Sequence, residues 1–385
     1  MVKLRWLKNL AILILKTGCH KEEKKLKFLE SWIFKDREKE ENSLFHVIPA
    51  PMELSVSYGS GTAAGPQAII EASDQLEVWD NFQASRDTES YLKQYDSVLR
   101  SGIYTVPPVD CKGEPETVLG RIEEAVARAL SFNQVASENR VISDNKVTSD
   151  NTPLNAIPVL LGGEHTVTLG ALRALKKYFI KSSANCDSKD STTNLDSASY
   201  NSNQSAALGN IRAPFGIIQI DAHADLRDSY QGSGLSHACV MRRTVDDLNI
   251  PLFQIGVRAI SYEEVIFRSQ KNIPFIDAKD IYSYGVKAIC DSDKLLPVDF
   301  PKKIYITLDV DGLDPSVIRA TGTPVPGGIS WYDTLTLLEK IIKIREVIGF
   351  DVVELAPVER DHASDFAAAQ LTYSVMGMIQ KYNIK

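Results

Sequence analysis

Short apolar runs alternate with longer helical patterns along most of the chain. Five runs of nearly continuous apolar residues stand out, and a further strand-like run begins at residues 46–48. Runs of this length and character are typical of strands that are buried on both faces, as in a parallel sheet. The five runs are residues 157–161, 215–220, 251–257, 303–308 and 349–355.

Helical patterns occupy the stretches between these runs. Residues 116–132 precede the first run, and residues 168–179 follow it. Two more patterns lie at residues 236–248, after the second run, and at residues 334–344, before the last. Strands that alternate with helices in this way predict a doubly wound α/β sheet with helices on both faces.

Two polar stretches interrupt the alternation. Between residues 181 and 210, Ser, Thr, Asn and Asp fill 18 of 30 positions, which leaves too little apolar surface for a core. A second polar stretch, near residues 133–156, contains the near-duplicate NRVISD and NKVTSD. Because strands and helices resume after each stretch, we expect one domain, residues 46–385, with two surface insertions.

The first 45 residues form a separate, highly charged segment. Basic residues precede an apolar run at residues 10–15, which resembles a weak signal sequence, but Lys16 closes that run after six residues. We therefore expect residues 1–45 to be a peripheral helical extension and the protein to be cytoplasmic. Since no run of 18 apolar residues exists, stable membrane insertion is not expected.

Charge and cysteine content exclude several classes of protein. Fifty acidic residues against 43 Lys and Arg give a net charge of −7, which argues against a nucleic-acid partner. Five cysteines form no CxxC pair, so neither a disulfide scaffold nor a cysteine zinc site is expected.

Three polar clusters follow directly on three of the apolar runs. The carboxyl ends of parallel strands share one edge of a sheet, and ligands bind in the crevice beyond that edge. If each strand continues into its cluster, side chains two residues apart also share a face. We therefore expect the clusters to meet in one crevice. Their titratable members are His165, Asp221, His223, Asp225, Asp309 and Asp311.

Four carboxylates cannot share one crevice in ionised form without cations between them. Oxygen ligands with two imidazoles suit two Mn²⁺ ions, although Ni²⁺, Co²⁺, Zn²⁺ and Fe²⁺ also accept such ligands. Two neighbouring ions lower the pKa of a bound water and produce a nucleophile near neutral pH. The sequence therefore predicts metal-assisted hydrolysis.

Each cluster taken alone has another interpretation. The sequence DVDG is also found in calcium loops and at the nucleophile of aspartate-dependent phosphatases. A calcium loop needs its glycine at the sixth position, whereas Gly312 stands at the fourth. A phosphatase would leave His165, Asp221 and His223 without a role. The three clusters together favour a binuclear metal site.

The same segments resemble the ureohydrolase family of arginases and agmatinases. Their order and spacing agree with that family over roughly residues 46–382, and the early loop at residues 58–66 is also similar. The resemblance implies a three-layer α/β/α fold around an eight-stranded parallel sheet. The motifs are GGEHTVTLG (162–170), DAHADLRD (221–228), SHACVMRR (236–243), TLDVDGLDPS (307–316), TGTPVPGG (321–328) and DVVELAP (351–357).

The resemblance also assigns roles to individual residues. It implies that a guanidinium group is hydrolysed to urea and an amine, with Glu354 holding the cationic substrate and His237 shuttling protons. Thr323 would contact the substrate through its hydroxyl. One metal ion would be bound by His165, Asp221, Asp225 and Asp309, and the other by Asp221, His223, Asp309 and Asp311.

Two positions bear on which guanidino compound is the substrate. Arg227 and Ala259 stand where arginases carry Asn and an acidic residue, so the chain looks closest to agmatinases, which convert agmatine to putrescine and urea. If Arg227 points into the pocket, a guanidino acid such as guanidinobutyrate is the alternative substrate. Arginase activity, or a catalytically silent regulatory relative, are further alternatives. The resemblance implies a homotrimer or homohexamer.

Overall fold

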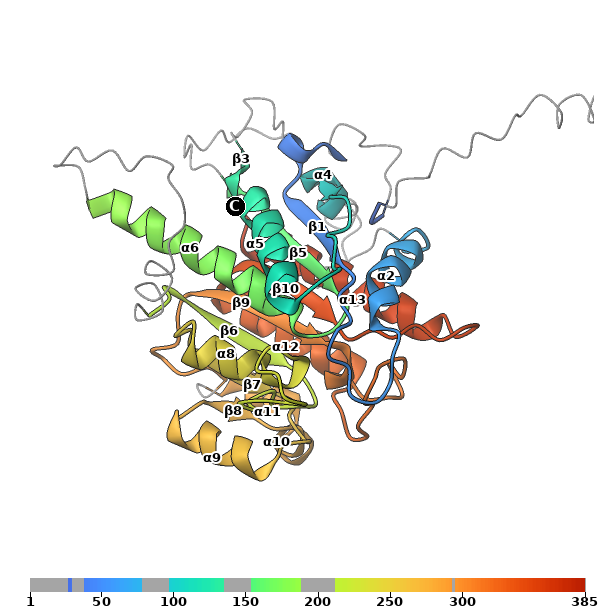
Figure 1. Cartoon of the computed structure of the whole chain (residues 1–385), viewed down its shortest axis with the longest axis vertical. Helices are drawn as coiled ribbons and strands as arrows, with labels where there is room; N and C mark the ends of the chain where they lie inside the picture. Colours follow the sequence, from blue (N-terminus) through green and yellow to red (C-terminus); the bar gives the residue numbers. More distant parts are fainter. Residues whose placement is uncertain are drawn as a thin grey trace, which may run out of the picture.

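A parallel sheet of eight strands forms the centre of the molecule (Figure 1). The structure is a computed structural model that describes residues 27–29, 38–77, 97–134, 154–187, 212–292 and 295–384. The predicted fold class is confirmed by this sheet and its helical layers. Most of the predicted extension (1–45) and of the two predicted insertions (133–156 and 181–210) lies outside the described residues.

The strand order is β2-β1-β5-β10-β9-β6-β7-β8, and every neighbouring pair is parallel. All residues of β1, β5 and β6 are buried, as strands covered on both faces must be. The strands are β1 (Phe45–Ala50), β2 (Ile103–Thr105), β5 (Ile157–Gly162), β6 (Phe215–Ile220), β7 (Leu252–Ile255), β8 (Phe275–Ile276), β9 (Lys303–Asp309) and β10 (Glu346–Val353). Two further strands, β3 (Asn133–Gln134) and β4 (Leu154–Asn155), form a separate antiparallel pair.

Helices cover both faces of the sheet, and each face has its own cluster of buried apolar side chains. One face carries α5 (Pro115–Ser131), α6 (Val167–Asp187), α8 (Val240–Asp246) and α9 (Tyr262–Gln270). The other carries α2 (Gly65–Ser73), α4 (Ser97–Ser101), α10 (Ala278–Tyr284), α11 (Val286–Asp291), α12 (Trp331–Ile344) and α13 (Ala363–Tyr382). Short 3₁₀ turns are η2 (Glu40–Asn42), η3 (Thr62–Ala64), η4 (His237–Cys239) and η5 (Val310–Gly312). This arrangement is the expected three-layer α/β/α architecture.

Side-chain caps explain where two of these helices begin. The Ser330 hydroxyl accepts a hydrogen bond from the Asp333 amide at the start of α12. At the start of α9, Ser261 and Glu264 form a reciprocal capping box, in which each side chain accepts from the other residue's backbone amide. Such caps satisfy amides that have no partner inside the helix.

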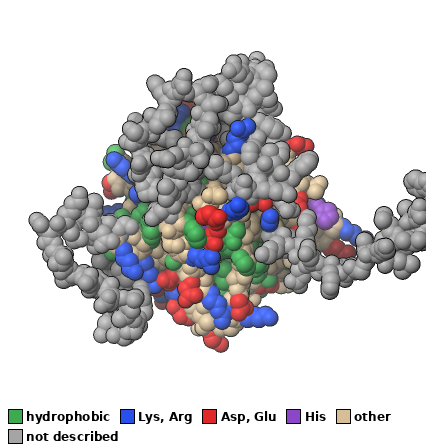
Figure 2. Space-filling view, turned by 90° about the horizontal axis from the view of Figure 1, so that it is seen from above, with side chains coloured by type: hydrophobic (Ala, Val, Ile, Leu, Met, Phe, Trp, Pro, Cys, Tyr) green, Lys and Arg blue, Asp and Glu red, His purple; other side chains and the backbone are tan. Residues whose placement is uncertain are grey.

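The described surface carries charges of both signs. Figure 2 shows Lys and Arg side chains interspersed with Asp and Glu on one face of the molecule. No described helix is long and apolar enough to span a bilayer.

Candidate active site

The predicted polar clusters meet because their strands are neighbours. Strands β5, β10, β9 and β6 lie side by side in the sheet, and all run in the same direction. The segments that leave their carboxyl ends therefore start from one edge. This edge brings together all six residues of the predicted metal site: His165, Asp221, His223, Asp225, Asp309 and Asp311.

Carboxylate oxygens surround His165, which is fully buried. Its Nδ1 lies 3.2 Å from Asp221 Oδ2, 3.0 Å from Asp225 Oδ2 and 3.3 Å from Asp309 Oδ2. The donor atoms of His165, Asp221 and Asp309 all lie within 4.8 Å of one another, close enough to hold one metal ion.

A second group of donors shares Asp221 with the first. His223 Nδ1 lies 3.0 Å from Asp311 Oδ2 and 3.7 Å from Asp221 Oδ1. The donor atoms of Asp221, His223 and Asp311 also lie within 4.8 Å of one another. Asp221 belongs to both groups, so the two candidate metal-binding groups are adjacent and share one carboxylate.

Turns, and not extended strands, aim these side chains. The expectation that strand alternation brings them together is wrong, because β6 already ends at Ile220 and Asp225 has a φ of 53°. Likewise, residues 310–312 form η5 directly after β9. Asp309 is still the last residue of β9, but the left-handed backbone at Asp225 and the 3₁₀ turn after β9 are features that periodicity alone does not reveal.

Backbone amides fix two of the carboxylates. Asp309 Oδ1 accepts from the Asp311 amide at 2.9 Å, which leaves Oδ2 facing His165. Asp311 Oδ1 accepts from the Ala222 amide at 3.0 Å, which leaves Oδ2 facing His223. One oxygen of each carboxylate is thus anchored and the other is presented to the site.

A hydrogen-bond chain sets the tautomer of His165. Thr307 donates its hydroxyl hydrogen to Asp351 Oδ1 at 2.6 Å, so its oxygen accepts from His165 Nε2 at 2.8 Å. Nδ1 is therefore the nitrogen that faces three carboxylates, and it has no hydrogen-bond partner among the described residues. Burial lowers the pKa of His165, but Asp221, Asp225 and Asp309 outweigh it and raise that pKa well above its usual value, so Nδ1 holds a positive partner there, either a proton or a metal ion. Metal-bound imidazoles are commonly oriented by such a second hydrogen bond.

Crowding of like charges perturbs the acidic groups. Burial, reinforced by the charge of Asp221, raises the pKa of Asp225 to about 7. Burial and the charges of Asp311 and Asp221 raise the pKa of Asp309 well above its usual value. Burial lowers the pKa of His223, but Asp221 and Asp311 outweigh it and raise that pKa to about 12. Proton-binding shifts of this kind mark a site built to hold positive charge.

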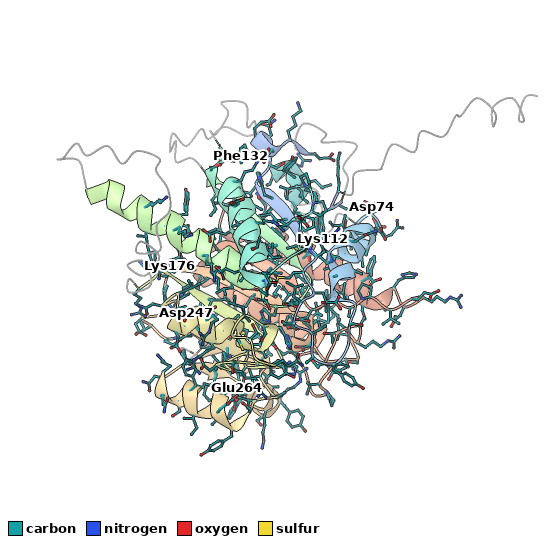
Figure 3. The ribbon with its side chains drawn as sticks, viewed as in Figure 1. Asp74, Lys112, Phe132, Lys176, Asp247 and Glu264 are labelled. Carbon is teal, nitrogen blue, oxygen red and sulfur yellow. The ribbon has the colours of Figure 1, made fainter. Side chains whose placement is uncertain are left out.

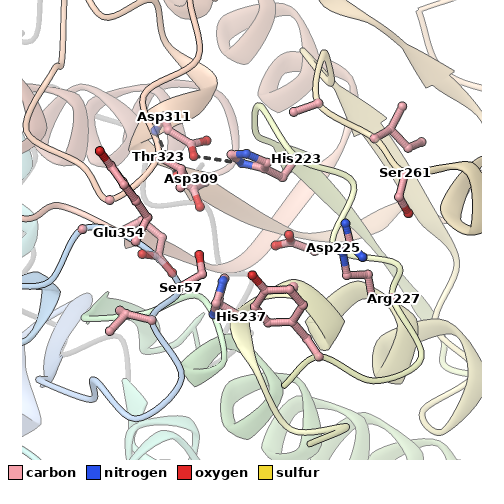
Figure 4. Close-up of a pocket in the computed structure, with 18 of the residues that line it drawn as sticks. Ser57, His223, Asp225, Arg227, His237, Ser261, Asp309, Asp311, Thr323 and Glu354 are labelled. Atoms are coloured by element: carbon pink, nitrogen blue, oxygen red, sulfur yellow. Dashed lines mark hydrogen bonds and ion pairs between the residues drawn. The ribbon is translucent and has the colours of Figure 1, made fainter. Parts of the chain in front are cut away.

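The clusters open into a pocket of about 380 Å³ (Figure 4). His223, Asp309 and Asp311 lie together at one wall, while Arg227 and Ser261 lie at another. A substrate in the pocket therefore lies between a wall of candidate metal ligands and a wall that contains a cationic side chain.

Comparison with known proteins identifies the family. Residues 43–377 match the model of the arginase family. The chain belongs to the arginase family.

Individual relatives agree with this assignment. The chain is 31% identical over 335 residues to an N(1)-aminopropylagmatine ureohydrolase from Synechocystis, covering 86% of this chain and 87% of that protein. It is 28% identical to an agmatinase from Pyrococcus horikoshii, covering 86% and 90% of the two chains. The predicted family and enzyme class, a hydrolase of the ureohydrolase type, are confirmed.

The fold agrees with a solved structure as well. The agmatine ureohydrolase of Thermoplasma volcanium superposes with a TM-score of 0.66 at 23% identity, covering 97% of this chain and 99% of that one. At this identity the likeness supports the fold alone.

The remaining predicted residues of this arginase-family site also line the pocket: His237, Thr323 and Glu354. His237 begins η4, and Glu354 follows directly after β10. Glu354 Oε1 accepts from the His165 amide at 2.6 Å. Burial lowers the pKa of His237, so its imidazole is neutral at neutral pH.

Arg227 lies at the rim of the pocket, so it agrees in part with both predicted orientations, into the pocket and away from it. It lines the pocket, yet its guanidinium is 3.4 Å from Glu263 Oε1 and 5.5 Å from the centre of the Tyr230 ring. Its charge is therefore partly offset by Glu263 and does not stand alone.

Sequence reasoning missed several residues of the pocket region, among them Ser55, Tyr230 and Glu264. Glu264 lies in the region of α9 (Figure 3) and carries a recognisable capping-box signal, Ser261-x-x-Glu264. That signal predicts a helix start but not that the carboxylate also faces a pocket. Ser55 lies in an irregular segment, where spacing gives no information about contacts.

Proposed function

We propose that the protein is a binuclear-metal hydrolase that releases urea from a guanidine whose other end is an amine, with agmatine or its aminopropyl derivative as substrate. The observation that carries this proposal is the charge at the wall of the pocket that contains Arg227 and Ser261, here called the outer end (Figure 4). Glu264 lies there, buried, and its carboxylate accepts from the amides of Leu226 at 2.9 Å and Ser261 at 2.8 Å. Backbone amides, and not a neighbouring cation, hold this carboxylate.

The balance of charge at that end favours an amine over a carboxylate. Glu263 partly offsets the charge of Arg227, and Glu264 adds a second negative group on the same side of the pocket. A distal ammonium is attracted by a buried carboxylate, whereas a distal carboxylate is repelled. Agmatine therefore fits better than arginine or guanidinobutyrate. The names of the relatives from Synechocystis and Pyrococcus horikoshii support the same substrate class.

The metal assignment follows the two donor groups. Following the family pattern, one ion would be held by His165, Asp221, Asp225 and Asp309, and the other by Asp221, His223, Asp309 and Asp311. We propose Mn²⁺ for both, because oxygen donors predominate. When bound, the ions supply a water of lowered pKa as the nucleophile.

Protein groups position the substrate and move the proton. A carboxylate at Glu354 binds the guanidinium through charge-assisted hydrogen bonds. Thr323 contacts the same end through its hydroxyl. Neutral His237 accepts a proton and passes it to the leaving nitrogen, which must depart as an amine.

The test measures urea from the Mn²⁺-loaded protein with agmatine, aminopropylagmatine, arginine, guanidinobutyrate and guanidinopropionate in parallel. We expect kcat/KM to be highest for the two amines and to be lost in Asp309→Ala. Glu264→Gln should raise KM for the amines and leave the weak turnover of guanidinobutyrate unchanged.

Two results would contradict the proposal in different ways. A preference for guanidinobutyrate would show that Arg227 governs the outer end, and the protein would be a guanidino acid hydrolase. An absence of urea from every substrate, after screening Ni²⁺, Co²⁺ and Zn²⁺ as well, would favour the silent regulatory relative.

A further inference from the structure

A half-buried hydrogen-bond network links His237 to Ser55 and Glu164. Ser55 Oγ is 2.9 Å from Glu164 Oε1. The same oxygen accepts from the His237 amide at 3.1 Å and lies 3.2 Å from His237 Nδ1. Three groups therefore converge on one hydroxyl.

The number of available hydrogens determines which group donates and which accepts in each hydrogen bond of this network. A serine hydroxyl has one hydrogen and two lone pairs. If Ser55 gave its hydrogen to His237, its oxygen would face Glu164 Oε1 at 2.9 Å with no hydrogen between two acceptors. Ser55 therefore donates to Glu164, and both lone pairs accept from His237. Nδ1 of His237 must then carry a hydrogen.

Glu164 is well placed to hold the serine. It is fully buried, and its Oε2 accepts from the amides of Leu54 and Ser55, each at 2.6 Å. Three donors thus converge on one carboxylate, which fixes the rotamer of Ser55 as well as its hydrogen. Tyr230 packs edge-on against the His237 ring, with centroids 5.5 Å apart and planes at 79°, and limits its rotation.

We propose that Ser55 and Glu164 are positioning residues that hold His237 as its Nδ1–H tautomer and leave Nε2 free to exchange protons with the pocket. This inference rests on the proposed function, in which His237 moves a proton. Nε2 is the atom that takes up and releases that proton. While it is bound, the imidazolium donates through Nδ1 to Ser55, whose hydroxyl is polarised by Glu164.

The kinetic test compares substitutions in one segment. Ser55→Ala removes the acceptor for Nδ1–H, and Ser55→Thr keeps it. Ser60→Ala is the matched control, since Ser60 lies in the same segment but is exposed. Because a positioned acid–base group contributes about 10²–10⁴-fold to rate, we expect Ser55→Ala to lower kcat by about tenfold to a hundredfold with KM little changed. Ser55→Thr should restore kcat, and Ser60→Ala should behave like the unmodified protein. An unchanged kcat in Ser55→Ala would overturn the proposal.

A spectroscopic test reads the tautomer without relying on activity. In NMR spectra of the full chain with ¹⁵N-labelled histidine, His237→Gln identifies the signals of that ring. We expect a protonated Nδ1 and an unprotonated Nε2 in the unmodified protein, and a mixture of tautomers in Ser55→Ala and Glu164→Gln. A protonated Nε2 with bare Nδ1 in the unmodified protein would refute the assignment. If the protein releases no urea from any guanidine, the proposed function fails, while this measurement still decides the orientation of His237.

Discussion

Glu354 shows how one residue is shaped by both its backbone and its neighbours. It follows β10 with a φ of 66°, a left-handed conformation that non-glycine residues seldom adopt. Its amide donates to Gly163 O at 2.8 Å, and its Oε1 accepts from the His165 amide. The strained turn is therefore stabilised by the loop after β5, and it directs the carboxylate into the pocket.

Replacing Glu354 by Gln should reduce substrate binding and turnover together. Burial raises the pKa of Glu354 to about 8, and a bound guanidinium favours its ionised form. The change keeps the shape but removes the carboxylate that pairs with guanidinium. Charge-assisted hydrogen bonds contribute about 1.5–3 kcal/mol, so kcat/KM should fall by about ten- to a hundredfold. Steady-state assays of urea release would measure this, with Mn²⁺ content as the control. Retained kcat/KM with normal metal content would show that Glu354 does not bind the cation.

Which site residues can be predicted from sequence depends on how they are placed. His165, Asp221 and Asp309 come immediately after apolar runs, so strand ends alone bring them to one edge. The contact of Asp225 with His165 involves a left-handed backbone conformation at Asp225, which sequence spacing does not predict. Ser55 lies 182 residues before His237 in the sequence, and its contact with His237 depends on tertiary structure.

At the scale of elements, the segment of residues 53–63 closes on itself through one side chain. Glu53 Oε1 accepts from the Gly61 amide and Oε2 from the Ala63 amide, both at 2.9 Å. Within that segment, residues 56–59 line the pocket. The carboxylate of Glu53 therefore ties the start of this segment to its end and supports the pocket wall between them.

Glu53→Ala should loosen this segment. We expect KM to rise several-fold while kcat changes less, because the wall binds substrate but supplies no proton. Each lost hydrogen bond contributes about 1 kcal/mol, so the free energy of unfolding should fall by about 2 kcal/mol. Urea titration and kinetics would measure both effects. Glu53→Gln is the matched variant, since its amide keeps one acceptor and should show about half the loss. Unchanged KM in Glu53→Ala would show that the segment is held by other contacts.

Many of the elements that the periodicity missed are short or largely buried. Strands β2 and β8 have three and two residues, too few for a pattern. Helix α13 is buried around most of its surface, so it lacks the single apolar stripe by which a surface helix is recognised. The central strands were predictable because burial on both faces makes them continuously apolar.

For the whole molecule, metal binding is coupled to pH through the buried carboxylates. Asp225 holds a proton below about pH 7 because burial and Asp221 disfavour its charged form. A cation must displace that proton, and it must also displace the proton that the acidic cluster keeps on His223. Both protons are lost more readily as the pH rises, so raising the pH strengthens metal binding.

We therefore expect the metal-stripped protein to bind Mn²⁺ more tightly at pH 8 than at pH 6. Asp225, with a pKa of about 7, changes from mostly protonated to mostly ionised over this range, which alone contributes about 1.4 kcal/mol, or about a tenfold change in apparent Kd. The proton displaced from His223 makes the total change larger. Titration calorimetry would measure Kd, and the thermal shift produced by Mn²⁺ should grow in parallel.

Asp228→Asn is the control, because Asp228 is an exposed carboxylate of the same loop and should leave the pH dependence intact. Asp225→Asn should weaken binding and flatten the pH dependence. An affinity that is the same at pH 6 and pH 8 would mean that protons and metal do not compete for Asp225 and His223, and the assignment of these two side chains as ligands would have to be abandoned.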